Sequence, residues 1–416
     1  MLFLFVRFLV KVTSVKIMDK VNVKRCLYIT YDGLLDPLGK SQVLPYILGL
    51  SEAGYRFTIL SFEKTDRDPK LIRELARQLQ SKNISWVNLS FVRGRFQGVL
   101  RMLRGAMAVR QIARREPFAV AHMRTIVPAV IFKLAFVRRP FIYDIRAFSG
   151  QWVDGRRLSE GSLAHRFLVW LEQRLIREAA GLVVLDQSGA DYLRNTYKCL
   201  PPVKVIPTSA DLRDLSSELI NPKPHPSFQV RFVFLGGARF PYLPVEGLQF
   251  VQALLAQGYN CVIDFINERD HAFVEQALQT VGFPRNRFRL FSLPPEEVHT
   301  RLPSYDCGLV FIADGPWIRM SSPTKIGEYL AAGLHVVGLR GIAAIDRLSA
   351  QSSCVETLDR SAEGCQLSGQ QAAELLSRIQ APNRPSEALQ LAMQHYDRAK
   401  AVAEYVDLYQ QVLLSR

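Results

Sequence analysis

The sequence predicts an α/β protein of two successive doubly wound domains, each a parallel sheet covered by helices on both faces. The chain has 416 residues, which is too long for one ordinary hydrophobic core. Short apolar runs of strand length alternate with amphipathic segments of helical length, and this order is typical of parallel sheets. A proline-rich segment, residues 221–227 (NPKPHPS), cannot be helical and separates two such alternating patterns.

Apolar runs and their periodicity locate the elements of the first domain. Strands are expected at residues 25–30 (RCLYIT), 56–62, near 86, 120–123, 141–145, 182–185 and 203–207. Helices, in which apolar residues recur at helical spacing, are expected at residues 42–53, 71–81, 99–115 and 163–178.

The same alternation restarts after the prolines. Strands are expected at residues 231–237, 260–266, 307–312 and 334–339, and helices at residues 245–257, 321–333 and 387–414. We therefore predict an N-terminal extension, a first Rossmann-like domain, a linker, a second Rossmann-like domain and a C-terminal helix that packs back toward the first domain. Their bounds are residues 1–22, 23–220, 221–228, 229–385 and 386–416.

Composition narrows the class of protein. Apolar residues make up 48% of the chain, which fits a globular protein and excludes a disordered one. The net charge of +15 favours an anionic partner, which is a membrane surface, a nucleic acid or a phosphorylated substrate. The six cysteines show no C-x-x-C spacing, so we expect neither a zinc site nor disulfides, and a reducing compartment.

Residues 1–17 allow two interpretations. Residues 2–10 are apolar, but they include Arg7 and are too short to span a bilayer. They are either a mis-assigned start, because Met18 directly precedes the first strand region, or a segment that lies in a membrane interface.

Two loops are candidates for ligand binding. In doubly wound sheets, ligands bind at the carboxyl ends of the strands, where loops meet helix N-termini. Residues 32–41 and 314–325 are loops of this kind. In the second loop, Ser321 or Ser322 can cap the helix that follows, and Pro323 suits its first turn.

The helix that begins at this loop is suited to bind a diphosphate. Its free N–H groups and positive dipole end attract an anion, and Lys325, next to Thr324, adds a formal charge. Glu328 lies one turn further on, where its carboxylate can accept two hydrogen bonds from a ribose diol. Gly333 is expected to end the helix. An ordinary capped helix of an α/β protein is the alternative interpretation.

The stretch S-P-T-K-I-G-E-Y-L-A-A-G-L-H-V resembles the donor-site helix of retaining GT-B glycosyltransferases, specifically glycosyltransferase family four. The resemblance covers residues 24–414. It implies a GT-B fold in which the second domain binds a nucleotide-sugar donor and the first faces the acceptor. The second glutamate of the family's E-x7-E motif falls at Glu328, and Met320 occupies the first position. The donor sugar is therefore expected to be held by Ser321, Ser322 or nearby backbone.

The resemblance extends to the opening of the first domain. Residues 27–55 are similar to the family's first strand, glycine loop and helix. Gly33 and Gly39 would let the backbone approach the donor phosphates or the acceptor. An ordinary turn is an equal alternative for each glycine taken singly.

A second glycine loop is implied at residues 235–248, LGGARFPYLPVEGL. Gly237 belongs to it, and Arg239 fills the place of the arginine that holds the diphosphate in family members. The lysine that usually follows is absent, and we expect Lys325 to compensate for it.

The segment FIYDIRAF, residues 141–148, matches the strand end that lies near the reacting sugar in the family. Arg146 cannot act as a base, but it can neutralise the charge of a departing phosphate, with Asp144 beside it. A structural Asp–Arg pair is the alternative. His122 and Arg124, at the end of the preceding strand, are further candidates to face the cleft, although a lone histidine is more often structural.

A basic segment, residues 93–115, contains seven arginines, no acid and interleaved aliphatic residues. Such a segment suits the surface of an anionic bilayer. A helix that packs on the core and exposes a solvated basic side is the alternative. The arginines are Arg93, Arg95, Arg101, Arg104, Arg110, Arg114 and Arg115.

By resemblance, the reaction is transfer of a glycosyl group from a nucleotide sugar, with retention of configuration, to a glycan or polyprenyl-linked acceptor. A polyprenyl-diphosphate glycan, an exopolysaccharide repeat and a small molecule all remain possible acceptors. No metal and no cofactor are expected, because the D-R-D triplet at residues 66–68 lies in a polar loop and not at a strand end. We expect a cytoplasmic protein, peripheral on the inner face of the plasma membrane.

Other classes of protein are less well supported. A nicotinamide-dependent oxidoreductase would need G-x-G-x-x-G after a strand, and neither Gly33–Gly39 nor Gly236–Gly237 has that spacing. A nucleic-acid partner is not expected, because no binding motif occurs and the arginines cluster with aliphatic side chains. An inactive GT-B-like binding partner remains an alternative, given Met320 and the absent lysine.

Overall fold

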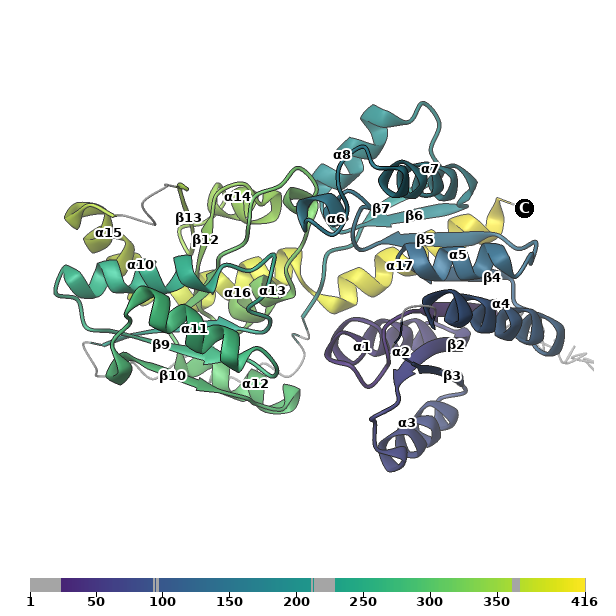
Figure 1. Cartoon of the computed structure of the whole chain (residues 1–416), viewed down its shortest axis with the longest axis horizontal. Helices are drawn as coiled ribbons and strands as arrows, with labels where there is room; N and C mark the ends of the chain where they lie inside the picture. Colours follow the sequence, from purple (N-terminus) through teal and green to yellow (C-terminus); the bar gives the residue numbers. More distant parts are fainter. Residues whose placement is uncertain are drawn as a thin grey trace, which may run out of the picture.

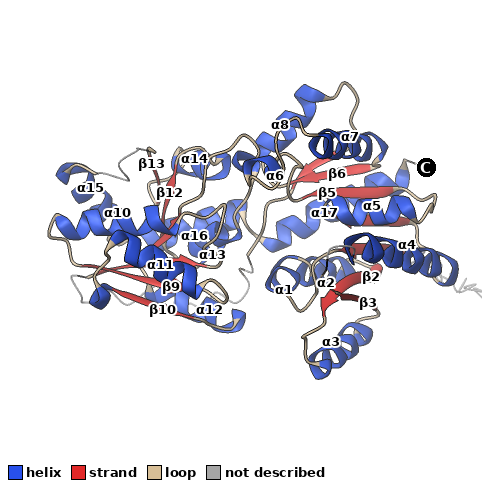
Figure 2. Cartoon of the chain, in the orientation of Figure 1, coloured by secondary structure: helices blue, strands red, loops and turns tan. Residues whose placement is uncertain are grey.

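The computed structural model describes residues 24–92, 94, 97–210, 212, 229–360 and 367–415. The predicted N-terminal extension and linker lie outside the described residues, as do Arg93 and Arg95. The described chain forms two sheets, one in each half, with helices on both faces of each (Figures 1 and 2). The predicted architecture of two doubly wound sheets is therefore confirmed.

The first sheet has seven strands in the order β3-β2-β1-β4-β5-β6-β7, and every neighbouring pair is parallel. The central strands β4 and β5 are buried along their whole length, as expected for a sheet covered on both faces. The strands are β1 Lys24–Thr30, β2 Tyr55–Lys64, β3 Ser85–Phe91, β4 Val120–Arg124, β5 Phe141–Ile145, β6 Gly181–Val184 and β7 Val203–Val205.

Two helical layers cover this sheet. Side chains of α4, α5, α7 and α8 pack into a core on one face, and those of α2, α3 and the C-terminal helix α17 pack into a core on the other. The helices of this half are α1 Pro37–Gln42, α2 Leu44–Glu52, α3 Pro69–Ser81, α4 Gln97–Arg115, α5 Ile126–Leu134, α6 Gln151–Asp154, α7 Leu163–Glu178 and α8 Gln187–Thr196.

The second sheet has six parallel strands in the order β10-β9-β8-β11-β12-β13. Its strands are β8 Val230–Leu235, β9 Cys261–Ile266, β10 Phe288–Phe291, β11 Cys307–Val310, β12 His335–Leu339 and β13 Val355–Leu358. Its helices are α10 Pro244–Ala256, α11 His271–Val281, α12 Pro295–Arg301, α13 Thr324–Ala331, α14 Ala343–Ser349 and α15 Gly369–Ile379, with short 3₁₀ turns η1 Arg285–Arg287, η2 Leu302–Ser304 and η3 Ile318–Met320.

The C-terminal segment crosses from the second half back to the first, as the yellow helices in Figure 1 show. It forms two helices, α16 Arg384–His395 and α17 Arg398–Leu414, so the prediction of one continuous helix is wrong. Asp397 interrupts the helical pattern because its carboxylate accepts a hydrogen bond from the Ala399 N–H (2.9 Å) and caps α17. Tyr405 and Tyr409 of α17 are buried against the first sheet.

Candidate functional site

Loops that follow strand carboxyl ends in the two halves contact one another. The Thr208 hydroxyl, after β7, donates a hydrogen bond to the Ser322 carbonyl, just before α13 (2.8 Å). The turn after β5 contacts the loop after β11, where Asp154 accepts a hydrogen bond from the Trp317 N–H (3.0 Å). This junction is the edge at which doubly wound sheets bind ligands, and α13 begins there.

The start of α13 differs from the predicted one at its cap. Pro323 occupies the cap position, and no side chain caps the helix. The prediction that Ser321 or Ser322 caps α13 is therefore wrong, because Ser322 is buried and its hydroxyl lies 3.3 Å from the Thr208 hydroxyl across the junction. The helix ends as predicted, since Gly333 follows the C-cap residue with a φ of +75°.

Lys325 lies in the first turn of α13 and is buried. Its Nζ has no hydrogen-bond partner among the described residues. It stands 3.8 Å from the centre of the Tyr242 ring and 4.5 Å from that of Phe234. Burial lowers the pKa of Lys325 to about 7, although Glu328 acts in the opposite direction. The ring faces favour the cation, so the site holds an ammonium that lacks an anionic ligand atom.

The other predicted residues of α13 lie on the same stretch of helix. Thr324 and Glu328 are partly exposed, whereas Lys325 is buried between them. Burial raises the pKa of Glu328 to about 7, and the charge of Lys325 opposes that rise. A carboxylate and an ammonium one turn apart thus form a polar strip at the start of the helix.

The second glycine loop contributes a different cation. Gly236, with a φ of +83°, and Gly237 are both exposed after β8. Arg239 is 67% exposed, donates to the Asp270 carboxylate (2.9 Å) and lies over the Phe273 ring. Arg239 is therefore at the surface of this loop, apart from the buried Lys325.

In the first half, the predicted glycine loop is held by an acid that the sequence analysis missed. The Glu63 carboxylate accepts hydrogen bonds from the N–H groups of Leu34 (2.6 Å) and Leu35 (3.4 Å). A side chain on Gly33 would collide with the Glu63 carboxylate, and one on Gly39 would collide with the Gly33 carbonyl. Both glycines are thus needed for the loop to pack on itself. The position of Glu63 within the apolar run of β2 was the sequence signal that could have identified it.

The predicted catalytic residues His122, Asp144 and Arg146 are brought together, but in a buried network. Arg146 Nε lies 2.9 Å from an Asp144 oxygen, and His122 Nε2 lies 3.3 Å from the other. Tyr405 of α17 donates to Asp144 (3.1 Å) and also bonds Arg146, and Tyr409 bonds His122 Nδ1 (2.8 Å). The sequence analysis missed both tyrosines.

This network keeps its carboxylate ionised. Burial alone would raise the pKa of Asp144, but Arg146 and His122 lower it to about 2. Burial lowers the pKa of His122, despite its bond to Asp144. Because α17 covers all three side chains, they hold the C-terminal helix on the first sheet in this structure. Arg124 lies beside them and pairs with Asp32 (2.8 Å) at the strand ends.

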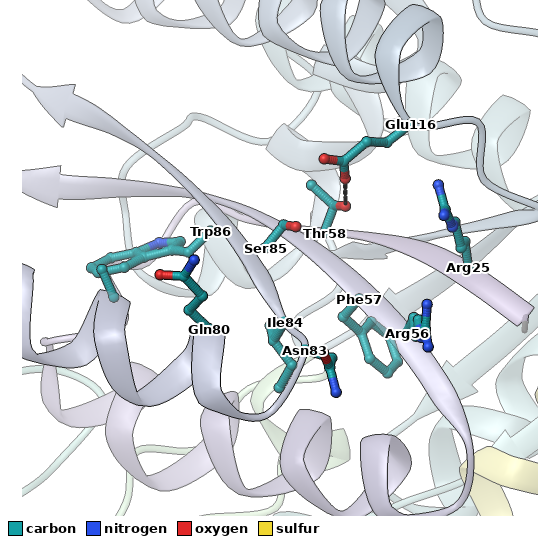
Figure 3. Close-up of a pocket in the computed structure, with 11 residues that line it drawn as sticks. Arg25, Arg56, Phe57, Thr58, Gln80, Asn83, Ile84, Ser85, Trp86 and Glu116 are labelled. Carbon is teal, nitrogen blue, oxygen red and sulfur yellow. Dashed lines mark hydrogen bonds between the residues drawn. The ribbon is translucent and has the colours of Figure 1, made fainter.

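A cavity of about 530 Å³ lies away from this junction (Figure 3). Arg25 and Arg56 line it at the starts of β1 and β2, and Trp86 lies on the far side from them in Figure 3. Glu116 accepts a hydrogen bond from Thr58 (2.9 Å). The cavity is therefore at the amino edge of the first sheet, opposite the edge where α13 begins. Among the described residues, no group of three or more His, Cys, Asp or Glu could hold a metal ion.

Comparison with known proteins bears on the fold. Residues 41–209 match the family model described as "Glycosyl transferase 4-like domain". No curated protein sequence matches the chain. Among solved structures, sucrose-phosphate synthase from Thermosynechococcus elongatus has a TM-score of 0.71 at 12% identity, over 94% of this chain and 100% of that one.

Two further structures share the arrangement. A glycosyltransferase from Rickettsia africae ESF-5 has a TM-score of 0.64 at 11% identity, over 94% of this chain and 99% of that one. MnaA from S. aureus, solved with UDP, has a TM-score of 0.54 at 11% identity, over 94% of this chain and 97% of that one. These similarities show the fold. The chain thus has the two-sheet α/β fold known as GT-B, and its residues 41–209 match the model of the glycosyl transferase 4-like family.

Proposed function

We propose that the protein transfers a glycosyl group from a nucleotide sugar to a glycan or polyprenyl-linked acceptor, with retention of anomeric configuration and without a metal or a separate cofactor. The family match of residues 41–209 and the GT-B fold support sugar transfer. The observation that carries the donor site is the buried Lys325 amine in the first turn of α13, which has no hydrogen-bond partner within the described part of the chain.

The donor diphosphate would bind at the start of α13. Free N–H groups and the helix dipole favour an anion there, and the protonated form of Lys325 adds a positive charge in surroundings of low dielectric constant. The same groups would stabilise the charge that develops on the departing diphosphate. Tyr242 stands over the ammonium. Since Tyr242 follows the exposed Gly236 and Gly237, a shift of this loop would admit a phosphate.

Other predicted residues complete the donor site in this proposal. Glu328 would accept hydrogen bonds from the ribose diol, and Arg239 would exchange Asp270 for the diphosphate. Thr324, Ser321 and the nearby backbone would contact the sugar. Arg146 and its partners Asp144 and His122 lie beneath α17, so we propose that they act on the reaction by holding the first domain in place.

A thermal-shift screen against UDP, GDP, ADP and their sugars tests this function. One nucleotide series should raise the melting temperature, because ligand binding to the folded state alone stabilises it. With the cognate sugar, the product's anomeric configuration read by NMR tests retention, and transfer that persists in EDTA tests metal independence. The absence of any nucleotide shift at millimolar concentration would contradict the proposal.

The surface of the first domain supports a membrane-bound acceptor. On α4, Leu100, Leu103 and Met107 are exposed beside Arg104 and Arg114. Apolar side chains that alternate with cations suit an anionic bilayer interface. In the described residues, no helix is both long enough and apolar enough to span a bilayer. We propose peripheral binding at the inner face of the plasma membrane, with the protein in the cytoplasm.

A second exposed stripe lies on α7, which covers the same face of the sheet as α4 (Figure 1). Leu163, Phe167 and Trp170 are 83%, 60% and 51% exposed, and Arg174 lies over the Trp170 ring.

Flotation with liposomes that contain anionic lipid should enrich the protein over neutral liposomes. Replacing Leu103 and Met107 by glutamine should reduce that enrichment, and equal flotation on both lipids would contradict membrane binding.

An inactive binding partner with the same fold is the second candidate function. It is favoured by one observation, the apolar Met320 at the position where the family motif has its first glutamate. Such a protein would show the nucleotide shift but neither transfer nor hydrolysis of the cognate nucleotide sugar. The same screen, followed by an assay of released nucleotide, therefore separates the two candidates.

A further inference from the structure

The short helix α6 of the first half touches two loops of the second half. Figure 1 shows α6 between the two sheets. At its end, a side chain on Gly155 would come within 3.2 Å of the Phe240 ring, which belongs to the glycine loop after β8. At its start, a side chain on Gly150 would overlap the Trp317 indole at 2.1 Å, in the loop after β11. Both contacted loops flank α13.

Asp154, the last residue of α6, is bonded to the backbone of the second loop. Its Oδ2 accepts hydrogen bonds from the N–H groups of Trp317 (3.0 Å) and Ile318 (2.9 Å). A side chain on Gly315 would lie 2.6 Å from the same oxygen, so glycine is needed there for the close approach. One carboxylate oxygen of the first half thus holds two successive amides that begin the η3 turn.

Neighbouring contacts fix the same loop from the side. Gln151 of α6 donates from Nε2 to the Trp317 carbonyl (3.1 Å). The Trp317 ring packs edge-on against Tyr192 of α8, with ring centres 5.2 Å apart, and lies 6.0 Å from Phe148. The backbone and the side chain of Trp317 are therefore both held by the first half of the molecule.

Met320 explains why the loop lies where it does. It is only 9% exposed, and its side chain belongs to the apolar core of the first half, although its residue is part of the second. A glutamate at this position would place a carboxylate in that core at a large desolvation cost. The departure from the family pattern at position 320 thus coincides with an apolar contact between the halves.

We propose that Asp154 is a positioning residue of the donor site, which fixes residues 315–320 and, through them, the start of α13. This inference rests on the proposed donor-binding function of α13. Met320 is only a few residues from Thr324, where the helix begins, and the intervening Ser322 is held by Thr208 (2.8 Å). The first half therefore anchors the approach to α13 at two points, of which Asp154 makes the charge-assisted one.

The test compares Asp154→Ala and Asp154→Asn with a matched control, Asp191→Ala. Asp191 is an exposed aspartate of α8 that, among the described residues, bonds its own helix neighbours Gln187 and Arg194. Two quantities are measured on the full chain well below its melting temperature. They are amide hydrogen exchange in the peptide that covers residues 315–320, and the dissociation constants of UDP, GDP and ADP by calorimetry.

For Asp154→Ala we expect the Trp317 and Ile318 amides to exchange at least about tenfold faster, because local opening loses two hydrogen bonds to a carboxylate. The affinity for the nucleotide that the wild type binds should fall about tenfold or more. Asp154→Asn keeps an oxygen that can accept both bonds, so its affinity should recover to within about threefold of the wild type. Asp191→Ala should change neither quantity.

The outcomes separate this inference from the proposed function. Unchanged exchange at residues 315–320 in Asp154→Ala would overturn the inference, and so would faster exchange with unchanged nucleotide affinity. If the wild type bound none of the three nucleotides, the proposed donor function itself would fail. A purely structural role would lower the melting temperature while leaving nucleotide affinity at low temperature unaltered, and that result also counts against positioning.

Discussion

The two halves of the molecule bury charged side chains in opposite ways. In the first half, the Asp144 carboxylate is bonded to Arg146, His122 and Tyr405. In the second half, the Lys325 ammonium is also buried, but it has ring faces around it and no hydrogen-bond partner among the described residues. A buried charge is costly unless it is paired.

This difference indicates that the Asp144 carboxylate stabilises the fold, whereas the Lys325 ammonium is available to bind a ligand. The network around Asp144 joins β4 and β5 to α17, so it connects residues far apart in the chain. Among the described residues, the Lys325 amine makes no hydrogen bond that links elements in this way, although it lies against the rings of Phe234 and Tyr242. Removing a member of the network should therefore affect stability, whereas removing Lys325 should affect binding.

The largest expected effect is on stability, for Asp144→Asn. The substitution leaves Arg146 buried without its carboxylate, which should cost about 3–5 kcal/mol of unfolding free energy. Urea unfolding measures it. The exposed Asp191→Asn is the control, with an expected change within about 0.5 kcal/mol. A loss below about 1 kcal/mol for Asp144→Asn would mean that the network does not hold α17 on the sheet.

The next effect is on binding, for Lys325→Met. The methionine keeps the approximate length of the side chain and removes a buried amine that has no hydrogen-bond partner among the described residues, so stability near pH 7 should stay equal or rise. Affinity for the cognate nucleotide should fall about tenfold or more, and the donor KM should rise accordingly. Calorimetry and steady-state transfer measure the two.

Lys204→Met is the matched control for this pair of results. Lys204 also carries an ammonium, but it pairs with Glu404 (2.7 Å) and Asp407 (2.5 Å) of α17 at the surface. Its removal should lower stability by about 1 kcal/mol or less and leave nucleotide affinity unchanged. If Lys325→Met lost stability but kept its nucleotide affinity, Lys325 would support the fold and would not bind the ligand.

The sequence predicts the fold because the buried strands and amphipathic helices of a parallel sheet each produce a recognisable local pattern of apolar residues. The expected bounds of the strand at residues 141–145 and of the helix at residues 163–178 coincide with β5 and α7. Helix α1 was missed because residues 32–41 were predicted as a loop, and the break between α16 and α17 was missed because the amphipathic pattern runs on through it. An Asp cap such as Asp397 is a local signal that could have located this break.

The site was predictable only in part, for a physical reason. The positions of Lys325 and Glu328 on one helix follow from their spacing, and the pair of Asp144 and Arg146 was an open alternative that the structure forms. The burial of Lys325 depends on Tyr242 and Phe234, and that of Asp144 on Tyr405. These contacts come from tertiary packing between distant segments, which one sequence read locally does not contain.

A change in pH should alter both stability and nucleotide binding, and the shift in the pKa of Lys325 gives the sign of each change. Burial lowers the pKa of Lys325 from 10.5 to about 7, so between these values the unfolded chain binds more protons than the folded one. The contribution of Lys325 to stability is therefore fully present above about pH 10.5 and is lost as the pH falls toward 7. The difference in unfolding free energy between the wild type and Lys325→Met should grow across that window.

Nucleotide binding should respond in the opposite direction. A diphosphate favours the protonated ammonium, so affinity should be highest below about pH 7 and fall by about three- to tenfold by pH 9, as Lys325 loses its proton. Calorimetric titrations at several pH values measure this slope, and Lys325→Met should abolish it. Subtracting the pH dependence of binding by Lys325→Met from that of the wild type removes the contribution of the nucleotide's own phosphate titration, since both proteins bind the same ligand. An equal slope in both proteins would mean that the unpaired ammonium does not face the phosphate, and the contrast between the two buried charges would then concern stability alone.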